Sequence, residues 1–162
     1  MIDLFTERRA VFSDDRKYRY TLAIQWDKDK PKLNFLMLNP STADEIKNDP
    51  TVERCERRAR NLGYGSVSIT NLFALRSTDP RALYDAEDPI GELNNIYILN
   101  EALVSAMVVC AWGVHGIFME RGETVLTMLR NLSIKPHCLK LSKSGTPCHP
   151  LYLPYTATPF EL

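Results

Sequence analysis

Four polar side chains mark the places where this chain is expected to carry chemistry, and none of them is a carboxylate. Asn39, Asn71 and His115 lie at or just after the end of an apolar segment, and His149 belongs to the loop after the last one. Amides and neutral imidazoles donate and accept hydrogen bonds, which suits a neutral, planar ligand such as a nucleobase. The set disfavours paired-carboxylate hydrolysis and Mg²⁺-dependent phosphoryl transfer, which need oxygen anions at the reacting centre.

Each of these residues also has an ordinary structural explanation. Asn before Pro is a common turn element, and that interpretation suits Asn39 taken alone. Asn71 can close an Asx turn at a strand end, and His149 before Pro150 can be a surface loop residue. His115, between two glycines, is typical of a helix start. The functional interpretation therefore depends on the order of the motifs along the chain.

The elements that would position these residues alternate between strands and helices. Apolar runs typical of strands buried on both faces occur at 33–38, 66–73, 107–112 and 137–141. Asp-Pro pairs, which favour helix starts, occur at Asp49-Pro50, Asp79-Pro80 and Asp88-Pro89. Helices are predicted over 50–62, 91–105 and 118–131. The alternation predicts an α/β domain with a mostly parallel four-stranded sheet and helices on both faces.

An antiparallel pair of strands is expected before this sheet, at 9–13 and 18–26. In helix 91–105, the residues Leu93, Ile96, Asn100 and Leu103 share a face. In helix 50–62, arginines 54, 57, 58 and 60 predict a solvated face.

Parallel sheets bind ligands at the carboxyl ends of their strands. The loops after 38, 71, 112 and 141 are therefore the candidate site. Lys140 and Lys143 lie beside the last of these loops and are the candidates for phosphate contact.

Composition bounds the alternatives. The chain has 162 residues, which suits one domain over 1–162, with 20 basic and 20 acidic residues and a formal net charge of zero. This balance argues against a protein that coats nucleic acid by bulk charge, and it leaves room for a local basic patch. The four cysteines show no C-x-x-C spacing, the N-terminal segment has no signal-peptide core, and the longest apolar run, 106–114, is too short to span a membrane. A cytoplasmic protein without metal or cofactor is expected.

Several motifs resemble those of an uncharacterised bacterial and phage family, catalogued as domain of unknown function 1643. They are the segments 38–44, 71–74, 111–113 and 145–152. The resemblance covers nearly the whole chain and implies no particular activity.

The order of the motifs is also similar to that of the uracil-DNA glycosylase superfamily. Asn39-Pro40 stands where the first strand of the superfamily ends in a water-positioning residue, and Asn71 where the superfamily reads the base. Trp112-Gly113 closes the third strand, and His149-Pro150 follows the fourth. The resemblance implies a three-layer α/β/α domain of the uracil-DNA glycosylase type.

This resemblance also implies roles for individual residues. Asn39 would orient a water molecule, and His149 would stabilise the leaving base by donating a hydrogen bond. Asn71 would read a pyrimidine edge, with Ser41 and Thr42 beside the base. Ser41 stands where the uracil-specific branch has a bulky tyrosine, which leaves room for a modified pyrimidine. Because an amide does not accept a proton near pH 7, such an enzyme is expected to be slow.

Three functions remain open at this point. The first is a hydrolase that recognises a pyrimidine base in DNA, ordinary or modified, and cleaves its N-glycosidic bond. The second is a module that binds a nucleotide or modified base without cleaving it, and the third is a hydrolase of a free nucleoside or nucleotide. The motif order favours the first, and the zero net charge favours the other two.

Overall fold

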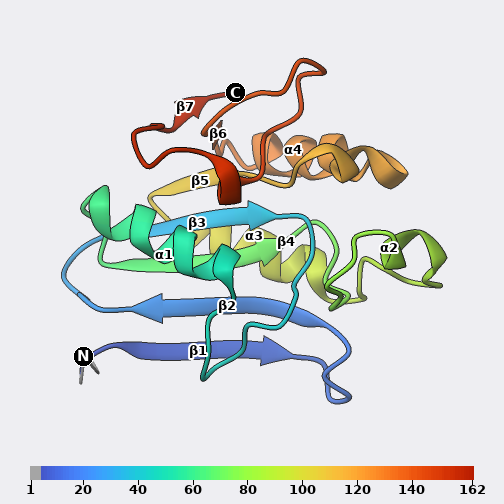
Figure 1. The fold of residues 1–162 in the computed structure, drawn as a ribbon, viewed down its shortest axis with the longest axis horizontal. Helices are drawn as coiled ribbons and strands as arrows, with labels where there is room; N and C mark the ends of the chain where they lie inside the picture. Colours follow the sequence, from blue (N-terminus) through green and yellow to red (C-terminus); the bar gives the residue numbers. More distant parts are fainter. Residues whose placement is uncertain (1–4) are drawn as a thin grey trace.

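Four parallel strands form the middle of the sheet in the computed structural model, which describes residues 5–162 (Figure 1). They are β3 (Lys32–Met37), β4 (Ser66–Asn71), β5 (Met107–Cys110) and β6 (Pro136–Cys138). β3 pairs with β4 on one side and with β5 on the other, and β6 continues beyond β5. The α/β prediction is confirmed. Residues 1–4, part of the N-terminal segment considered above, lie outside the described residues.

The sheet is larger than expected, with seven strands in the order β1-β2-β4-β3-β5-β6-β7. β1 (Glu7–Phe12) and β2 (Arg19–Gln25) form the antiparallel pair, but β2 also pairs with β4. The N-terminal pair is therefore part of the same sheet and not a separate addition to it. At the other edge, β7 (Phe160–Glu161) pairs with β6. Two residues are too short for a periodic pattern, so the sequence did not predict β7.

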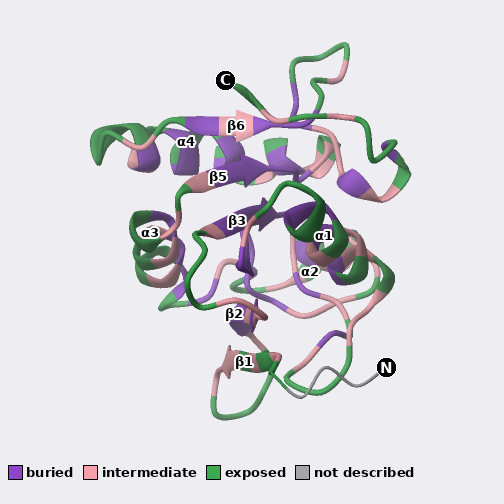
Figure 2. Cartoon of the chain, turned by 90° about the vertical axis from the view of Figure 1, so that its left-hand side faces the viewer, coloured by how far each residue is buried: buried purple, intermediate pink, exposed green. Residues whose placement is uncertain are grey.

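Helices cover both faces of the sheet (Figure 2). α1 (Pro50–Asn61) contributes Val52, Cys55 and Ala59 to a core on one face. α3 (Asn94–Val104) and α4 (Arg121–Asn131) contribute to a second core on the other face. α2 (Ala82–Asp85) and the 3₁₀ segments η1 (Val114–Glu120) and η2 (Pro150–Tyr152) lie in connecting segments.

The helix-start signals had mixed outcomes. Asp49 caps α1 by accepting a hydrogen bond from the Val52 amide at 2.9 Å, as predicted. Asp88-Pro89 does not start α3, because the Asp88 carboxylate instead accepts from the Gly91 amide and the helix begins at Asn94. The last long helix begins at Arg121, after η1, and not at residue 118.

The apolar face predicted for α3 is turned toward solvent. Leu93, Ile96 and Leu103 are 44%, 57% and 58% exposed, whereas Asn94 and Ile98 are fully buried. The Asn94 amide donates to the backbone carbonyls of Asn71 and Leu72 at 2.9 and 3.1 Å. Satisfying those buried carbonyls fixes which face of the helix meets the sheet.

Two arginines of α1 hold the loop that carries His149. Arg58 is 2% exposed and donates to the backbone carbonyls of Leu153 at 2.7 Å and Pro154 at 3.1 Å, and Arg54 donates to those of Pro150 and Leu153. Their guanidinium groups also lie against the ring of Tyr155. The prediction of a solvated arginine face is therefore wrong for Arg58 and holds for the exposed Arg57 and Arg60.

Replacing Arg58 tests this attachment. Arg58→Met keeps the length of the side chain but loses the charged donors, so it is expected to lower the free energy of unfolding by about 2 kcal/mol. Arg57→Met, one position away on the exposed side of α1, is the matched control. It loses only the more distant contact of Arg57 with the Tyr155 ring, at 5.7 Å, and should stay within about 0.5 kcal/mol of the parent. Urea unfolding measures both, and equal effects of the two substitutions would contradict the attachment.

Candidate functional site

Asn39 lies two residues after β3, Asn71 is the last residue of β4, and His149 belongs to the loop after β6. β3 and β4 run parallel, and their carboxyl ends lie on the side of the sheet toward which the β3 arrow points in Figure 1. Backbone hydrogen bonds hold these loops together. The amides of Leu72 and Phe73 donate to the carbonyls of Met37 and Leu38, both at 2.9 Å. The Gly113 amide, after β5, donates to the Pro147 carbonyl at 2.8 Å, two residues before His149.

Asn71 has a buried amide without a partner. The residue is 1% exposed, and neither its side-chain nitrogen nor its side-chain oxygen has a hydrogen bond. The Asx-turn explanation is therefore wrong, because it needs that oxygen to accept a bond from the backbone. An unsatisfied buried amide costs about 1–3 kcal/mol. A donor and an acceptor are thus held, unused, at the end of β4.

The backbone beside this amide is fixed tightly. The Leu72 carbonyl accepts two hydrogen bonds, one from the Asn94 side chain and one from the Nε of Arg121 at 2.8 Å. Arg121 is 3% exposed, and burial lowers its pKa to about 10, so it remains a cation near pH 7. The end of β4 therefore cannot shift easily to give the Asn71 amide a partner.

Asn39 joins two of the loops. Its side-chain nitrogen donates to the backbone carbonyls of Pro40, Leu75 and Ser77, at 3.2, 3.4 and 3.0 Å. The turn explanation for Asn39 is thus supported. Within residues 5–162 no group donates to its Oδ1, which leaves this oxygen for a water molecule or a ligand.

His149 is held as a neutral donor. Its Nδ1 accepts a hydrogen bond from the Leu151 amide at 3.2 Å, so the ring hydrogen of the neutral form lies on Nε2. Burial lowers the pKa of the ring, and the nearby carboxylate of Asp49 partly opposes this shift. His149 therefore presents a neutral Nε2–H, the form that stabilises a developing anion without itself losing a proton.

The remaining predicted residues lie farther out. Ser41 and Thr42 line an open hollow of about 450 Å³ beside the loop after β4. Lys140 and Lys143 are exposed on the loop that leads to His149, and neither forms an ion pair with a described residue. His115 lies in η1, where its Nδ1 is 3.1 Å from the Tyr84 hydroxyl, in keeping with a helix-start residue.

A separate cavity of about 890 Å³ runs along α4. Trp112, Gly116 and Thr146 are among its lining residues, but Asn39, Asn71 and His149 are not. Asn39 and Asn71 lie at the ends of two paired strands, His149 lies in the loop after β6, and none of the three lines that cavity.

Three of the four cysteines are buried, and Cys148 is partly exposed. Cys55 and Cys110 are fully buried, which raises the pKa of both thiols well above the ordinary value. Within the described range no cluster of His, Cys, Asp and Glu could hold a metal ion. The same range has no helix that is long and apolar enough to cross a bilayer.

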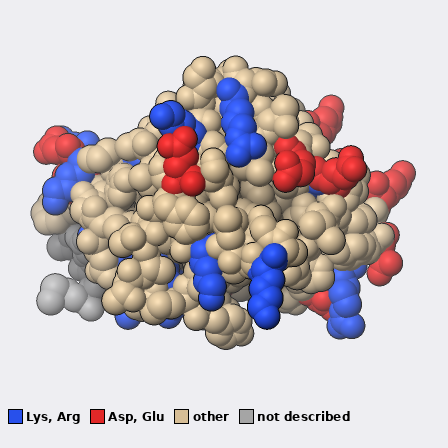
Figure 3. Space-filling model, turned by 90° about the horizontal axis from the view of Figure 1, so that it is seen from above, with Lys and Arg blue, Asp and Glu red and all other residues tan. Residues whose placement is uncertain are grey.

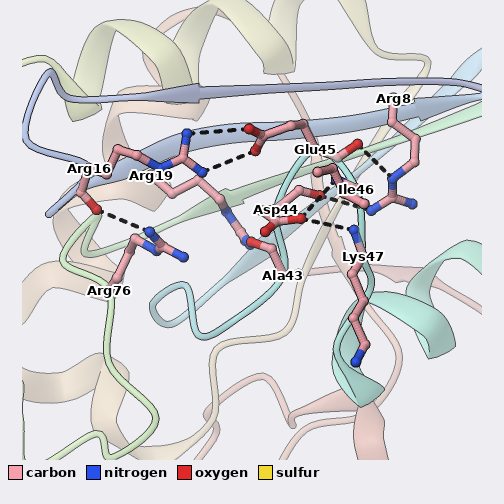
Figure 4. Close-up of polar contacts among 9 residues, drawn as sticks. All are labelled: Arg8, Arg16, Arg19, Ala43, Asp44, Glu45, Ile46, Lys47 and Arg76. Carbon is pink, nitrogen blue, oxygen red and sulfur yellow. Dashed lines mark hydrogen bonds and ion pairs between the residues drawn. The ribbon is translucent and has the colours of Figure 1, made fainter.

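The sequence did not single out Arg19 or Asn94. Arg19 is 2% exposed, has no carboxylate partner among the described ion pairs, and donates to the Ala43 carbonyl at 2.9 Å (Figure 4). Burial lowers its pKa to about 10, so it remains charged near pH 7. A cation inside the aromatic and apolar run 18–26 was the available signal. Asn94 gave none, because its partners are backbone carbonyls of a distant strand.

Residues 19–151 match the model of a family described as a protein of unknown function, DUF1643. The chain belongs to this family. No curated protein and no solved structure matches it. The matched range includes β2 to β6 and all the candidate residues, so the DUF1643 chain carries its strand-end amides and His149 inside the family region.

Asn71 and Asn94 form a matched pair for stability. Asn71→Leu removes an unsatisfied amide and is expected to raise the free energy of unfolding by about 1 kcal/mol. Asn94→Leu is equally buried but removes two hydrogen bonds, and should lower it by about 2 kcal/mol. Urea unfolding measures both. A loss of stability in Asn71→Leu as large as in Asn94→Leu would show that the Asn71 amide is satisfied.

The titration of His149 tests its protonation state. Because its pKa is lower in the folded than in the unfolded chain, the unfolded chain binds more protons between the two values. Stability is therefore expected to fall as the pH drops below about 6.5. Nitrogen-15 NMR should show a neutral ring with hydrogen on Nε2 at pH 7, titrating below the value in the urea-unfolded chain. Hydrogen on Nδ1 at pH 7 would contradict the assignment.

Proposed function

We propose that this chain recognises a pyrimidine base, ordinary or modified, at the carboxyl ends of its parallel strands and hydrolyses the N-glycosidic bond. The buried, unpartnered amide of Asn71 carries the proposal. One donor and one acceptor, fixed side by side, match the edge of a pyrimidine, which offers an acceptor and a donor in return. The unsatisfied amide costs stability in the free protein, and a bound base would recover it.

The base reaches this amide only after a local opening. Both polar atoms of Asn71 are covered in the present conformation. The segment 39–49, which contains no helix or strand, connects β3 to α1 at this edge. Displacement of such a loop breaks fewer backbone hydrogen bonds than displacement of a strand, but it also breaks the hydrogen bond from Arg19 to the Ala43 carbonyl. Binding is thus expected to be coupled to loop movement.

The hydrolysis assigns one task to each of two side chains. The oxygen of a water molecule bonds to the sugar carbon as the carbon–nitrogen bond breaks, and the bonding electron pair leaves with the base. His149 Nε2–H donates to a base carbonyl on which negative charge develops. Asn39 Oδ1 accepts a hydrogen bond from the water, and the proton passes to solvent because an amide does not take it. These assignments are the ones that the resemblance of the motif order to the uracil-DNA glycosylase superfamily implies.

Binding without cleavage is the second candidate, and Asn39 favours it. The amide nitrogen of Asn39 is fully used to join the two loops, and its oxygen is not a base. With an amide at Asn39 in place of a carboxylate, the protein can still recognise a base at Asn71 but would hydrolyse the glycosidic bond slowly. The zero net charge of the chain adds no general attraction for DNA, and the face seen in Figure 3 carries both acidic and basic side chains. A free nucleotide is therefore retained as an alternative substrate, whereas Lys140 and Lys143 are the proposed phosphate contacts if the ligand is DNA.

Base release from a panel of substrates tests the proposal. The panel contains oligonucleotides with uracil or 5-substituted uracils, and the matching free nucleotides. His149→Ala is expected to lower the rate of release about 10²- to 10³-fold, because a donor to the developing anion is lost. His137→Ala, at a histidine outside the site, is the control and should leave the rate unchanged.

The outcomes separate the candidates. Tight binding without release, abolished by Asn71→Leu, would favour the binding module. A steep fall of affinity with the logarithm of salt concentration would assign DNA over a free nucleotide. If no member of the panel is bound or cleaved, the proposal that a base binds at the carboxyl ends of the strands is wrong.

A further inference from the structure

The hollow that contains Ser41 and Thr42 is lined by cations and hydroxyl groups. Its basic side chains are Arg16, Lys17 and Arg76, and its hydroxyl side chains belong to residues 41–42 and 77–78. No Asp or Glu is among the lining residues. In a chain with zero net charge, such a local excess of positive charge points to an anionic ligand.

Three segments that are far apart in the sequence form the hollow, and backbone hydrogen bonds hold them in place. The Arg76 amide donates to the Lys17 carbonyl at 3.0 Å, and the Ser77 amide donates to the Pro40 carbonyl at 2.8 Å. The turn between β1 and β2 thus lies against the loops after β3 and β4. The hollow is part of the fold and does not depend on the chance positions of long side chains.

Its positive charge is only partly neutralised. Arg16 forms two hydrogen bonds with the Glu45 carboxylate, at 3.1 and 3.3 Å. Lys17 and Arg76 form no ion pair with any residue in the range 5–162. Two other carboxylates lie nearby. Asp44 accepts hydrogen bonds from two backbone amides of its own loop (Figure 4), and Asp15 accepts one from the Lys17 backbone amide at 3.0 Å.

The two arginines of the hollow, Arg16 and Arg76, lie close to each other. Arg76 donates to the Arg16 carbonyl at 3.2 Å, and its Nε is buried without a hydrogen bond. Both guanidinium groups lie over the ring of Phe12, at 3.8 Å for Arg16 and 4.9 Å for Arg76. Two like charges on one ring repel each other, and a shared anion would relieve that repulsion.

We propose that this hollow binds the phosphate group of a nucleotide. Guanidinium and ammonium groups together with hydroxyl donors match the several oxygens of a phosphate. Ser77 lines the hollow, and its carbonyl accepts from the Asn39 amide at 3.0 Å, so the hollow adjoins the proposed base site. The inference rests on the proposed function only for the base that accompanies the phosphate. It gives Ser41 and Thr42 a role at the phosphate in place of the base.

NMR titration of the nitrogen-15-labelled full chain tests the hollow. The probes are inorganic phosphate, deoxyuridine, deoxyuridine 5′-monophosphate and a short single-stranded oligodeoxyuridine without a terminal phosphate. Phosphate and the monophosphate are expected to shift the amides of residues 41–42 and 77–78. Lys17→Gln should weaken monophosphate binding about tenfold, because one charged contact is lost. Lys28→Gln, at an exposed lysine outside the hollow, should leave it unchanged.

Glu45→Gln gives a response of opposite sign, which a merely structural role would not produce. Freed from its carboxylate partner, Arg16 should bind phosphate more tightly, so affinity is expected to rise severalfold. Because Arg76 also supports the fold, Arg76→Gln is a supplementary variant, and the conclusion depends on Lys17→Gln and Glu45→Gln.

The remaining comparisons separate the sources of phosphate and the two proposals. Tighter binding of the monophosphate would assign a terminal phosphate, and tighter binding of the oligonucleotide an internal diester. Asn71→Leu should leave the affinity for inorganic phosphate unchanged, so a failed base site does not remove support for the hollow. Shifts confined to the loop of Lys140 and Lys143, or no effect of Lys17→Gln, would overturn the proposal.

Discussion

The parallel pairing of β3 between β4 and β5 is the constraint on which the candidate site depends. In this register Met37 lies beside Asn71, and Leu36 lies beside Cys110. The carboxyl ends of the three strands therefore lie on the same side of the sheet, and the chain leaves each strand through a loop on that side. Asn39, Asn71 and the loop packed against His149 come together there, although 110 residues separate Asn39 from His149 in the sequence.

Buried side-chain amides in the sheet differ in whether they have hydrogen-bond partners. Asn34 is as buried as Asn71, but its amide donates to Ser68 and Thr70. At the end of β4, Asn94 and Arg121 satisfy the backbone carbonyls while the Asn71 amide is left without a partner. Other described residues, Asn94 among them, have one buried polar atom without a partner, but at Asn71 both the nitrogen and the oxygen lack one. Folded chains pair nearly all of their buried polar groups, so such an exception is typical of a functional position.

Arginines occupy two different kinds of position in this fold. Arg58 and Arg121 use their donors on backbone carbonyls, and this fixes the loop of His149 and the end of β4. Arg19 anchors the loop after β3 through the Ala43 carbonyl. Arg76 instead lies at an open hollow with no carboxylate partner among the described residues. Arg76 also donates to the Arg16 carbonyl, but it differs from the other three in lining a hollow that is open to solvent.

The sequence by itself determined the α/β class, the four parallel strands, the helix start at Asp49 and the placement of Asn39 and Asn71 at the ends of strands. These features follow from local patterns in the sequence, namely runs of apolar residues and helix-capping residues. It did not determine that the N-terminal pair joins the sheet, that α3 turns Leu93 and Ile96 to solvent, that Arg58 is buried, or that Asn71 lacks a partner. Each of these depends on which groups meet across distant segments, because hydrogen bonding and burial are properties of the packed chain and leave no periodic signal along it.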